Sequence, residues 1–245
     1  MTFTSASSSR PEAVAIPALT ARQMREVDRL MTEEFGIDLP RMMENAGRAL
    51  AELAIDAFEP SSVVVLAGPG GNGGGGLVAA RHLLNRDRGV RVVLAAPAER
   101  LAPVPAHQLD ILTRMGADVT DAEPRSPNVS ADLVIDAVLG YSLTGDPRTP
   151  AAGLIDWTND QPSPVLSLDT PSGLDVTTGI PADPCVTATA TMTLALPKTG
   201  LLTAPGARQA GMLYLADISV PHAVYERMDI EVGPVFSTRT IVPIS

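Results

Sequence analysis

The sequence is poor in aromatic residues, in cysteine and in positive charge, and each shortage narrows the choice of fold and function. Phe, Trp and Tyr make up 3% of the 245 residues, so a core must be built mainly from Val, Leu, Ile, Ala and Met, as in buried parallel strands and their covering helices. The one cysteine, Cys185, excludes a disulfide within the chain and fits a reducing, cytoplasmic location. A net charge of -10 argues against nucleic-acid binding, because neutralising phosphates needs a basic face.

The start of the chain and its apolar runs give no sign of a membrane or secretory segment. No apolar run is long enough to span a bilayer, so we expect no membrane partner. The opening MTFTSASSSRPEA lacks the apolar stretch of a secretory signal, and we expect residues 1–19 to be a disordered tail. Residues 20–245 are enough for one large hydrophobic core, so they predict a single α/β domain.

The pattern of apolar residues predicts two helices and then an alternation of strands and helices. Residues 20–34 and 38–58 carry apolar side chains at helical spacing, with Thr20 as N-cap and Pro40 in a first turn. Apolar runs of strand length and helical segments then alternate: strands at 62–67, 91–95, 132–139 and 165–169, and helices at 76–85, 107–115 and 152–159. This alternation is typical of a doubly wound parallel sheet, and strands at 189–196 and 212–218 would extend it at one edge.

The most distinctive segment is GPGGNGGGG at residues 68–76, between the first strand and a helix. Glycines let a ligand approach the backbone, and the start of the helix offers free N–H groups and the positive end of its dipole. The segment fits G-x-G-x-x-G, but no acidic residue ends the second strand and no Walker A lysine follows. The alternative is a merely flexible turn, but the conformational entropy that so many glycines lose on folding disfavours it. We therefore predict a phosphate or pyrophosphate site for a small molecule.

Polar residues stand at the ends of the third and fourth predicted strands. Asp136 precedes GYSLTGD, and Asp169 precedes TPSGLD. Ligands of open α/β sheets bind beyond the carboxyl ends of the strands, so two carboxylates meeting there could position a cation or act as acid and base. A helix cap or a turn is the alternative for either carboxylate alone. Lys198, after the strand at 189–196, could reach a phosphate or a carboxylate, or could equally be a solvated loop residue.

Several of these segments, in this order, resemble the NAD(P)H-hydrate epimerases, whose domain is also called the YjeF N-terminal domain. The resemblance covers about residues 20–221. It is carried by MREVDRL, MMENAG, GPGGNGGGGLVAARHL, DLVIDAVLGYSLTGDPR, LDTPSGLDVTTG, LPKTG and GMLYLADISVP.

The resemblance implies a Rossmann-like three-layer αβα fold with a mostly parallel sheet and two N-terminal helices. It implies an isomerase that interconverts the R and S forms of NAD(P)HX, the hydrated nicotinamide dinucleotides. NAD(P)HX is then the substrate, and no redox cofactor is expected. A bound potassium ion and a homodimer belong to the same expectation.

The resemblance also carries site residues onto this chain. Asn72, Asp136 and Ser172 match the potassium ligands, and Asp169 and Lys198 are the candidates for moving protons at the carbinolamine carbon. The residues expected to contact the substrate come from the glycine segment and from the ends of the third and fourth strands: Gly70, Gly71, Asn72, Gly73, Gly74, Gly75, Gly140, Tyr141, Ser142, Leu143, Thr144, Gly145, Asp146 and Asp169.

The glycine segment departs from the family pattern at two positions. The family usually reads GPGNNGGDG there, so Gly71 and Gly75 stand in place of an asparagine and an aspartate. Backbone N–H groups can still hold a phosphate after these changes, whereas side-chain chemistry at the two positions is lost. Two alternatives therefore stand beside the epimerase. One is a divergent isomerase or cyclase-type enzyme that uses the same pocket for another small molecule, and the other is a non-catalytic ligand-binding or scaffold module.

Overall fold

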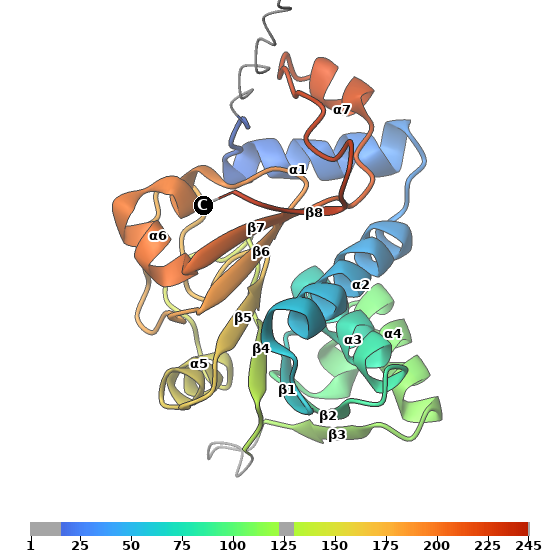
Figure 1. Cartoon of the computed structure of the whole chain (residues 1–245), viewed down its shortest axis with the longest axis vertical. Helices are drawn as coiled ribbons and strands as arrows, with labels where there is room; N and C mark the ends of the chain where they lie inside the picture. Colours follow the sequence, from blue (N-terminus) through green and yellow to red (C-terminus); the bar gives the residue numbers. More distant parts are fainter. Residues whose placement is uncertain (1–15, 123–129, 245) are drawn as a thin grey trace, which may run out of the picture.

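One eight-stranded sheet forms the centre of the computed structural model, which describes residues 16–122 and 130–244 (Figure 1). The strand order is β3-β2-β1-β4-β5-β6-β7-β8, and all neighbours are parallel except β7 and β8, which are antiparallel. The strands are β1 Ser62–Ala67, β2 Gly89–Leu94, β3 Asp118–Asp121, β4 Leu133–Ala137, β5 Val165–Leu168, β6 Ala190–Leu194, β7 Met212–Ala216 and β8 Ile241–Pro243. The mostly parallel sheet predicted from the sequence is confirmed.

Helices cover both faces of the sheet and complete three layers. In Figure 1 α2, α3 and α4 lie on one face and α5 and α6 on the other, while α1 crosses one end beside α7. The helical elements are α1 Ala21–Arg29, the π-helical turn η1 Leu30–Glu34, α2 Leu39–Phe58, α3 Gly71–Leu84, η2 Ala98–Arg100, α4 Pro103–Arg114, α5 Ala151–Asn159, η3 Thr199–Leu202, α6 Ala204–Ala210 and α7 His222–Glu226. The Rossmann-like three-layer fold with two N-terminal helices is confirmed.

Local sequence signals set the ends of the first elements. The Thr20 hydroxyl accepts the N–H of Gln23, and the Gln23 side chain accepts the N–H of Thr20, which together form a capping box. The carboxylate of Asp38 caps α2, whose first turn contains Pro40. Strand β1 lies between β2 and β4 and is buried along almost its whole length, which explains its continuous run of apolar residues.

Helix α3 begins at Gly71 and not at residue 76, so the prediction of a glycine loop over 68–76 is wrong for most of the segment. Gly73, Gly74, Gly75 and Gly76 are not among the glycines with positive φ, and a β-carbon at each would meet a neighbour, so packing explains them better than turning. A β-carbon at Gly74 would lie 2.5 Å from the Met43 side chain of α2, and one at Gly76 would lie 2.7 Å from the β-carbon of Ala137 in β4. The glycines therefore let α3 approach its neighbours closely.

Other differences from the predicted elements are smaller. Helix α4 begins at Pro103 and not at residue 107, and β2 begins at Gly89 and not at residue 91. Six elements were not predicted from the sequence: β3, β8, α6, α7 and the 3-10 helices η2 and η3. All six are short, and β3 and β8 form the two edges of the sheet.

Packing begins before residue 20, where the domain was predicted to start. Leu19 is fully buried. Its N–H donates to the carbonyl of Pro197 at 2.8 Å, and its carbonyl accepts the N–H of Thr199 at 2.9 Å, so the two segments form a bridge at Lys198. Residues 1–15 of the predicted tail lie outside the described residues.

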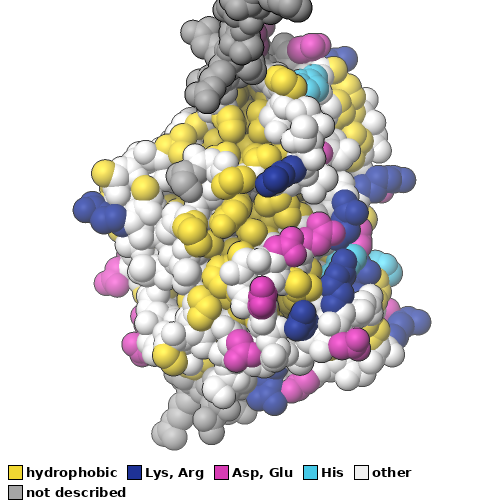
Figure 2. All heavy atoms as spheres, viewed as in Figure 1, with side chains coloured by type: hydrophobic (Ala, Val, Ile, Leu, Met, Phe, Trp, Pro, Cys, Tyr) yellow, Lys and Arg dark blue, Asp and Glu magenta, His cyan; other side chains and the backbone are white. Residues whose placement is uncertain are grey.

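The face seen in Figure 2 carries a band of hydrophobic side chains between α6 and α2. A groove of about 840 Å³ lies on this side, because α2 does not cover β7 and β8. Its apolar walls include Leu53 of α2, Tyr214 of β7 and Ile241 of β8. Among residues 16–122 and 130–244, no helix is both long enough and apolar enough to cross a membrane.

Candidate functional site

A cavity of about 470 Å³ lies at the carboxyl ends of the central strands. Helices α1 and α2 form an apolar wall with Met24, Met42 and Met43, and the start of α3 and the segment after β4 form the polar side. Nine of the residues proposed from the sequence line it: Gly70, Gly71, Asn72, Gly75, Gly140, Tyr141, Ser142, Asp169 and Lys198. The predicted site residues are therefore brought together at the sheet edge where open α/β proteins bind ligands.

The remaining candidates lie away from the cavity wall. Gly73 packs against the backbone of Gly68, and Gly74 packs against Met43, so both are packing positions of α3. Leu143, Thr144, Gly145 and Asp146 continue the segment after Ser142 and are mostly exposed. Asp136 and Ser172 are fully buried beneath the cavity floor and do not line it.

The start of α3 offers the cavity unpaired backbone donors. Gly70 is the N-cap and makes no side-chain capping bond, and the first intrahelical bond runs from the N–H of Gly74 to the carbonyl of Gly70 at 3.0 Å. The N–H groups of the first turn are therefore left for a ligand, with the positive end of the helix dipole behind them. This arrangement suits a phosphate or another anion, as predicted for the segment.

Asp169 follows β5 directly and has a strained backbone. Its φ is +65°, and the N–H of Thr170 donates to the carbonyl of Leu168 at 2.8 Å across it, which forms a γ-turn of the uncommon positive-φ kind. Its own N–H donates to Met192 of β6 at 2.7 Å. Such conformations cost about 1–3 kcal/mol and persist where neighbouring contacts hold them, often at functional sites.

Lys198 is fully buried, so the alternative of a solvated loop lysine is wrong. Its ammonium group donates to one carboxylate oxygen of Asp169, to the Thr193 hydroxyl at 3.3 Å and to the Leu194 carbonyl at 2.9 Å. Those three acceptors use all three N–H donors of a lysine. Lys198 therefore acts on the cavity through Asp169.

The two oxygens of Asp169 have different surroundings. Oδ1 accepts from Lys198, from the N–H of Leu194 at 3.3 Å and, at the limit of hydrogen bonding, from the Thr193 hydroxyl at 3.5 Å. Within the described residues, Oδ2 has no hydrogen-bond donor. Because Asp169 lines the cavity, Oδ2 is the atom free to exchange a proton with a ligand.

Asp136, near the end of β4, accepts hydrogen bonds from neutral groups on both of its oxygens. It accepts from the Ser167 hydroxyl at 2.8 Å, from the backbone and hydroxyl of Ser172 at 2.8 and 2.5 Å, and from the N–H of Val138 at 3.3 Å. Burial raises the pKa of its carboxyl above the ordinary value, and these hydrogen bonds oppose the rise. No Lys or Arg of the described residues forms an ion pair with it.

Asn72 and Ser172 both bond the backbone of Leu139. The amide nitrogen of Asn72 donates to the carbonyl of Leu139 at 3.0 Å, and the Ser172 hydroxyl accepts the N–H of Leu139 at 2.8 Å. The three residues predicted to bind potassium thus come together from α3, β4 and the segment after β5. They supply one carboxylate and neutral oxygens, and no cluster of three His, Cys, Asp or Glu side chains exists in the described part of the chain.

Asp28 of α1 also lines the cavity, and the sequence interpretation missed it. The Tyr141 hydroxyl donates to its Oδ2. Asp28 lies four residues after buried Met24 and one after buried Val27, which places it on the inner face of the helix. This helical spacing was the signal in the sequence that could have indicated Asp28 as a site residue. Burial raises the pKa of Asp28, while the bond from Tyr141 lowers it less.

Comparison with known proteins agrees with this description. A protein of Dehalogenimonas lykanthroporepellens named NAD(P)H-hydrate epimerase is 44% identical over 225 residues, which cover 90% of this chain and 89% of that protein. A protein of Truepera radiovictrix with the same name is 38% identical, over 87% of this chain and 94% of that protein. A crystal structure of the yeast protein ynu0 has a TM-score of 0.79 and 24% identity, over 94% of this chain and 100% of that chain.

Other relatives are longer. The bifunctional NAD(P)H-hydrate repair enzyme Nnr of Salinibacter ruber is 38% identical over 94% of this chain, which spans 46% of that relative's length. Fold and cavity define a Rossmann-like α/β protein with a cavity at the carboxyl ends of its parallel strands. The chain belongs to the family described as YjeF-related protein N-terminus, whose family model matches residues 40–200.

Proposed function

We propose that this protein interconverts the R and S forms of NAD(P)HX. The observation that carries the proposal is the free oxygen of Asp169, which is held at the cavity by Lys198 through its other oxygen. Family membership and the names of relatives at 38–44% identity support the same reaction.

The reaction needs a proton acceptor at the hydroxyl of the hydrated ring. Asp169 Oδ2 takes the hydroxyl proton, the carbon–oxygen bond becomes a carbonyl, and the bond from that carbon to the ring nitrogen breaks as the nitrogen gains a proton. Closure on the other face of the carbonyl, with the proton movements reversed, gives the opposite epimer. The unpaired N–H groups at the start of α3 hold the pyrophosphate.

Lys198 serves this reaction as a positioning residue. All its donors are used within the protein, and one of them fixes Oδ1 of Asp169. A lysine buried in this way needs its carboxylate partner, because an unpaired buried charge is costly. The pair therefore keeps Asp169 aimed at the cavity.

A potassium ion held by Asn72, Asp136 and Ser172 is part of the proposal. A fully buried carboxylate is normally compensated by a cation, and Asp136 has neutral donors in place of one. One carboxylate with amide and hydroxyl oxygens suits a hard cation of low charge. When bound, the ion supplies positive charge beneath the cavity floor. A homodimer and a single domain over residues 20–245 stay predictions.

A divergent isomerase on another small molecule is the second candidate. It is favoured by Gly75, where a β-carbon would lie 2.7 Å from Leu168 Cδ2. The family carboxylate is therefore replaced by an apolar part of the wall. Gly71, in contrast, has nothing within 4 Å of its β-carbon position, so that change enlarges the cavity mouth.

The deciding experiment supplies the protein with one epimer. An equilibrated NADHX mixture is treated with an excess of S-specific dehydratase until the S form is exhausted, and the protein is then added while NADH absorbance is followed. Epimerase activity predicts that the remaining R form disappears much faster than by spontaneous epimerisation.

The matched control is Asp132→Asn, an exposed carboxylate at the opposite end of β4, which should behave like the wild type. A wild-type rate equal to the spontaneous rate would overturn the proposal and favour the second candidate or a non-catalytic binding module.

A further inference from the structure

A second carboxyl group faces the cavity from the helix side. Asp28 lies on α1, whereas Asp169 lies at the end of β5, so the two reach the same space from different layers. We propose that Asp28 is a second proton-transfer group of this site and works as the partner of Asp169. This inference rests on the proposed epimerisation.

The carboxyl groups of Asp28 and Asp169 are held in the same way. One oxygen of Asp169 is held by Lys198, and one oxygen of Asp28 is held by the Tyr141 hydroxyl. Within the described residues, Oδ1 of Asp28 has no hydrogen-bond donor. Each side chain therefore has one fixed oxygen that sets its direction and one oxygen left for a ligand.

The groups that contact Asp28 differ from those that contact Asp169. Asp169 has a direct ion pair with Lys198, whereas Asp28 has a neutral phenol as its contact. Burial is the largest influence on the pKa of Asp28 and raises it; Tyr141 and the more distant Lys198 lower it, and Asp169 raises it. Arg25 is the other charged group that acts on Tyr141. Asp28 thus keeps a proton to higher pH than an ordinary aspartate, which suits a general acid.

This assignment balances the reaction. When Asp169 takes the hydroxyl proton and the carbon–nitrogen bond breaks, Asp28 gives its proton to the ring nitrogen. During closure on the other face, Asp28 takes the proton back from the nitrogen and Asp169 returns its proton to the oxygen. Both groups end in their starting states, so no co-reactant is needed.

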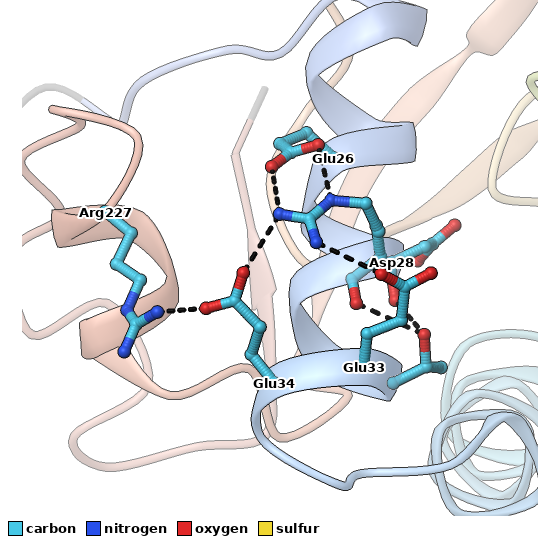
Figure 3. A network of polar contacts seen from close by, with 7 residues as sticks. Glu26, Asp28, Glu33, Glu34 and Arg227 are labelled. Atoms are coloured by element: carbon cyan, nitrogen blue, oxygen red, sulfur yellow. Dashed lines mark hydrogen bonds and ion pairs between the residues drawn. The ribbon is translucent and has the colours of Figure 1, made fainter.

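The position of α1 is fixed from its outer side. Arg29 forms ion pairs with Glu26, Glu33 and Glu34. Figure 3 shows Glu34 contacting Arg227 of α7. Arg227 also lies 5.4 Å from the ring centre of Phe35. These exposed contacts join η1, which continues α1, to α7, and buried Met24 and Val27 pack the helix that carries Asp28 against the core. The Thr32 hydroxyl adds a bond to the carbonyl of Asp28 at 2.8 Å.

The test compares pH–rate profiles of the wild type, Asp28→Asn and Tyr141→Phe in the NADHX assay. If Asp28 is the acid, the wild-type rate falls as pH rises through its raised pKa. Asp28→Asn cannot give a proton, so its kcat should fall about 100-fold and this alkaline decline should vanish. Tyr141→Phe removes a donor that favours the ionised form, so the decline should remain and move to higher pH.

Two further variants keep the outcome decisive. Glu33→Gln, in the turn η1 that continues α1 and outside the cavity lining, should leave the profile unchanged. Asp28→Ala should regain rate when acetate is added, because a small carboxylic acid can replace the missing group. If the wild type epimerises NADHX while Asp28→Asn keeps its rate and its alkaline decline, the role of Asp28 is refuted and the proposed function stands. If the wild type itself is inactive, both proposals fail.

Discussion

Asp136 and Asp169 lie near the carboxyl ends of two neighbouring parallel strands and yet have opposite surroundings. Asp136 is the second-last residue of β4, Asp169 directly follows β5, and the two are 0% and 4% exposed. Asp169 has a buried lysine as its counter-charge, whereas Asp136 has hydroxyl and backbone N–H groups. Position and residue type alone therefore do not decide what a buried carboxylate does; its partners decide it.

Asp136 and Asp169 also differ in the hydrogen bonds of their carboxylate oxygens. Both oxygens of Asp136 accept hydrogen bonds, so this residue is suited to hold groups in place. Asp169 has one oxygen fixed and one free, so it is suited to react. The predictions below test whether these two arrangements can be separated.

The largest effect is expected from breaking the buried ion pair on one side. Lys198→Met leaves Asp169 buried without a counter-charge and should lower the free energy of unfolding by about 3–5 kcal/mol, measured by urea denaturation. The double variant Asp169→Asn/Lys198→Met removes both charges. It should recover most of the lost stability, and asparagine tolerates the positive φ at this position.

Recovery of stability should not restore activity. The double variant lacks the proton acceptor, so its epimerisation rate should fall at least about 1000-fold below that of the wild type, measured in the NADHX assay. A double variant that is both stable and active would show that Asp169, like Asp136, has a purely structural part.

The next effect concerns the missing counter-charge of Asp136. Potassium chloride should raise the melting temperature more than choline chloride at equal ionic strength, and a concentration ten times the Kd should add about 1.4 kcal/mol of stability. Asp136→Asn should abolish the difference between the two salts, because it removes the one carboxylate of the proposed site. Asp132→Asn, one residue before the same strand begins, should retain it. A salt response that survives Asp136→Asn would place the ion elsewhere.

The smallest effects are expected where the glycine segment departs from the family. Gly71→Asn places a side chain in open space and should change stability by less than about 1 kcal/mol. Gly75→Asp brings a third carboxylate to a cavity that has one lysine, and its β-carbon meets Leu168 at 2.7 Å, so it should lower stability by about 1 kcal/mol. Thermal denaturation should show a lower melting temperature for Gly75→Asp than for Gly71→Asn. Equal melting temperatures of the two variants would contradict this prediction.

Much of the fold could be predicted from the sequence because buried parallel strands are continuous apolar runs. Strand β1 was predicted with its observed bounds, and β4 and β5 within one or two residues. The glycine segment was predicted wrongly because a run of glycines is compatible with a turn and also with a tightly packed helix. The distinction depends on Met43 and Ala137, which approach α3 only in the folded protein.

The candidate site could be predicted where it follows strand ends. Asp136, Asp169 and Lys198 each end or follow a strand, and parallel topology brings such ends together. The choice between a solvated and a paired lysine could not be made, because the partner lies 29 residues away. Asp28 was missed for a similar reason: its partner Tyr141 is 113 residues distant.

The bridge between Leu19 and Lys198 has a consequence for biosynthesis. Leu19 pairs with the backbone on both sides of Lys198, so one of the first described segments closes over a residue from the last quarter of the chain. Asp169 obtains its counter-charge from that same residue. In a nascent chain that has formed β1 to β5, the proposed reaction centre is therefore still incomplete, and it is completed only after Lys198 and Thr199 have emerged from the ribosome.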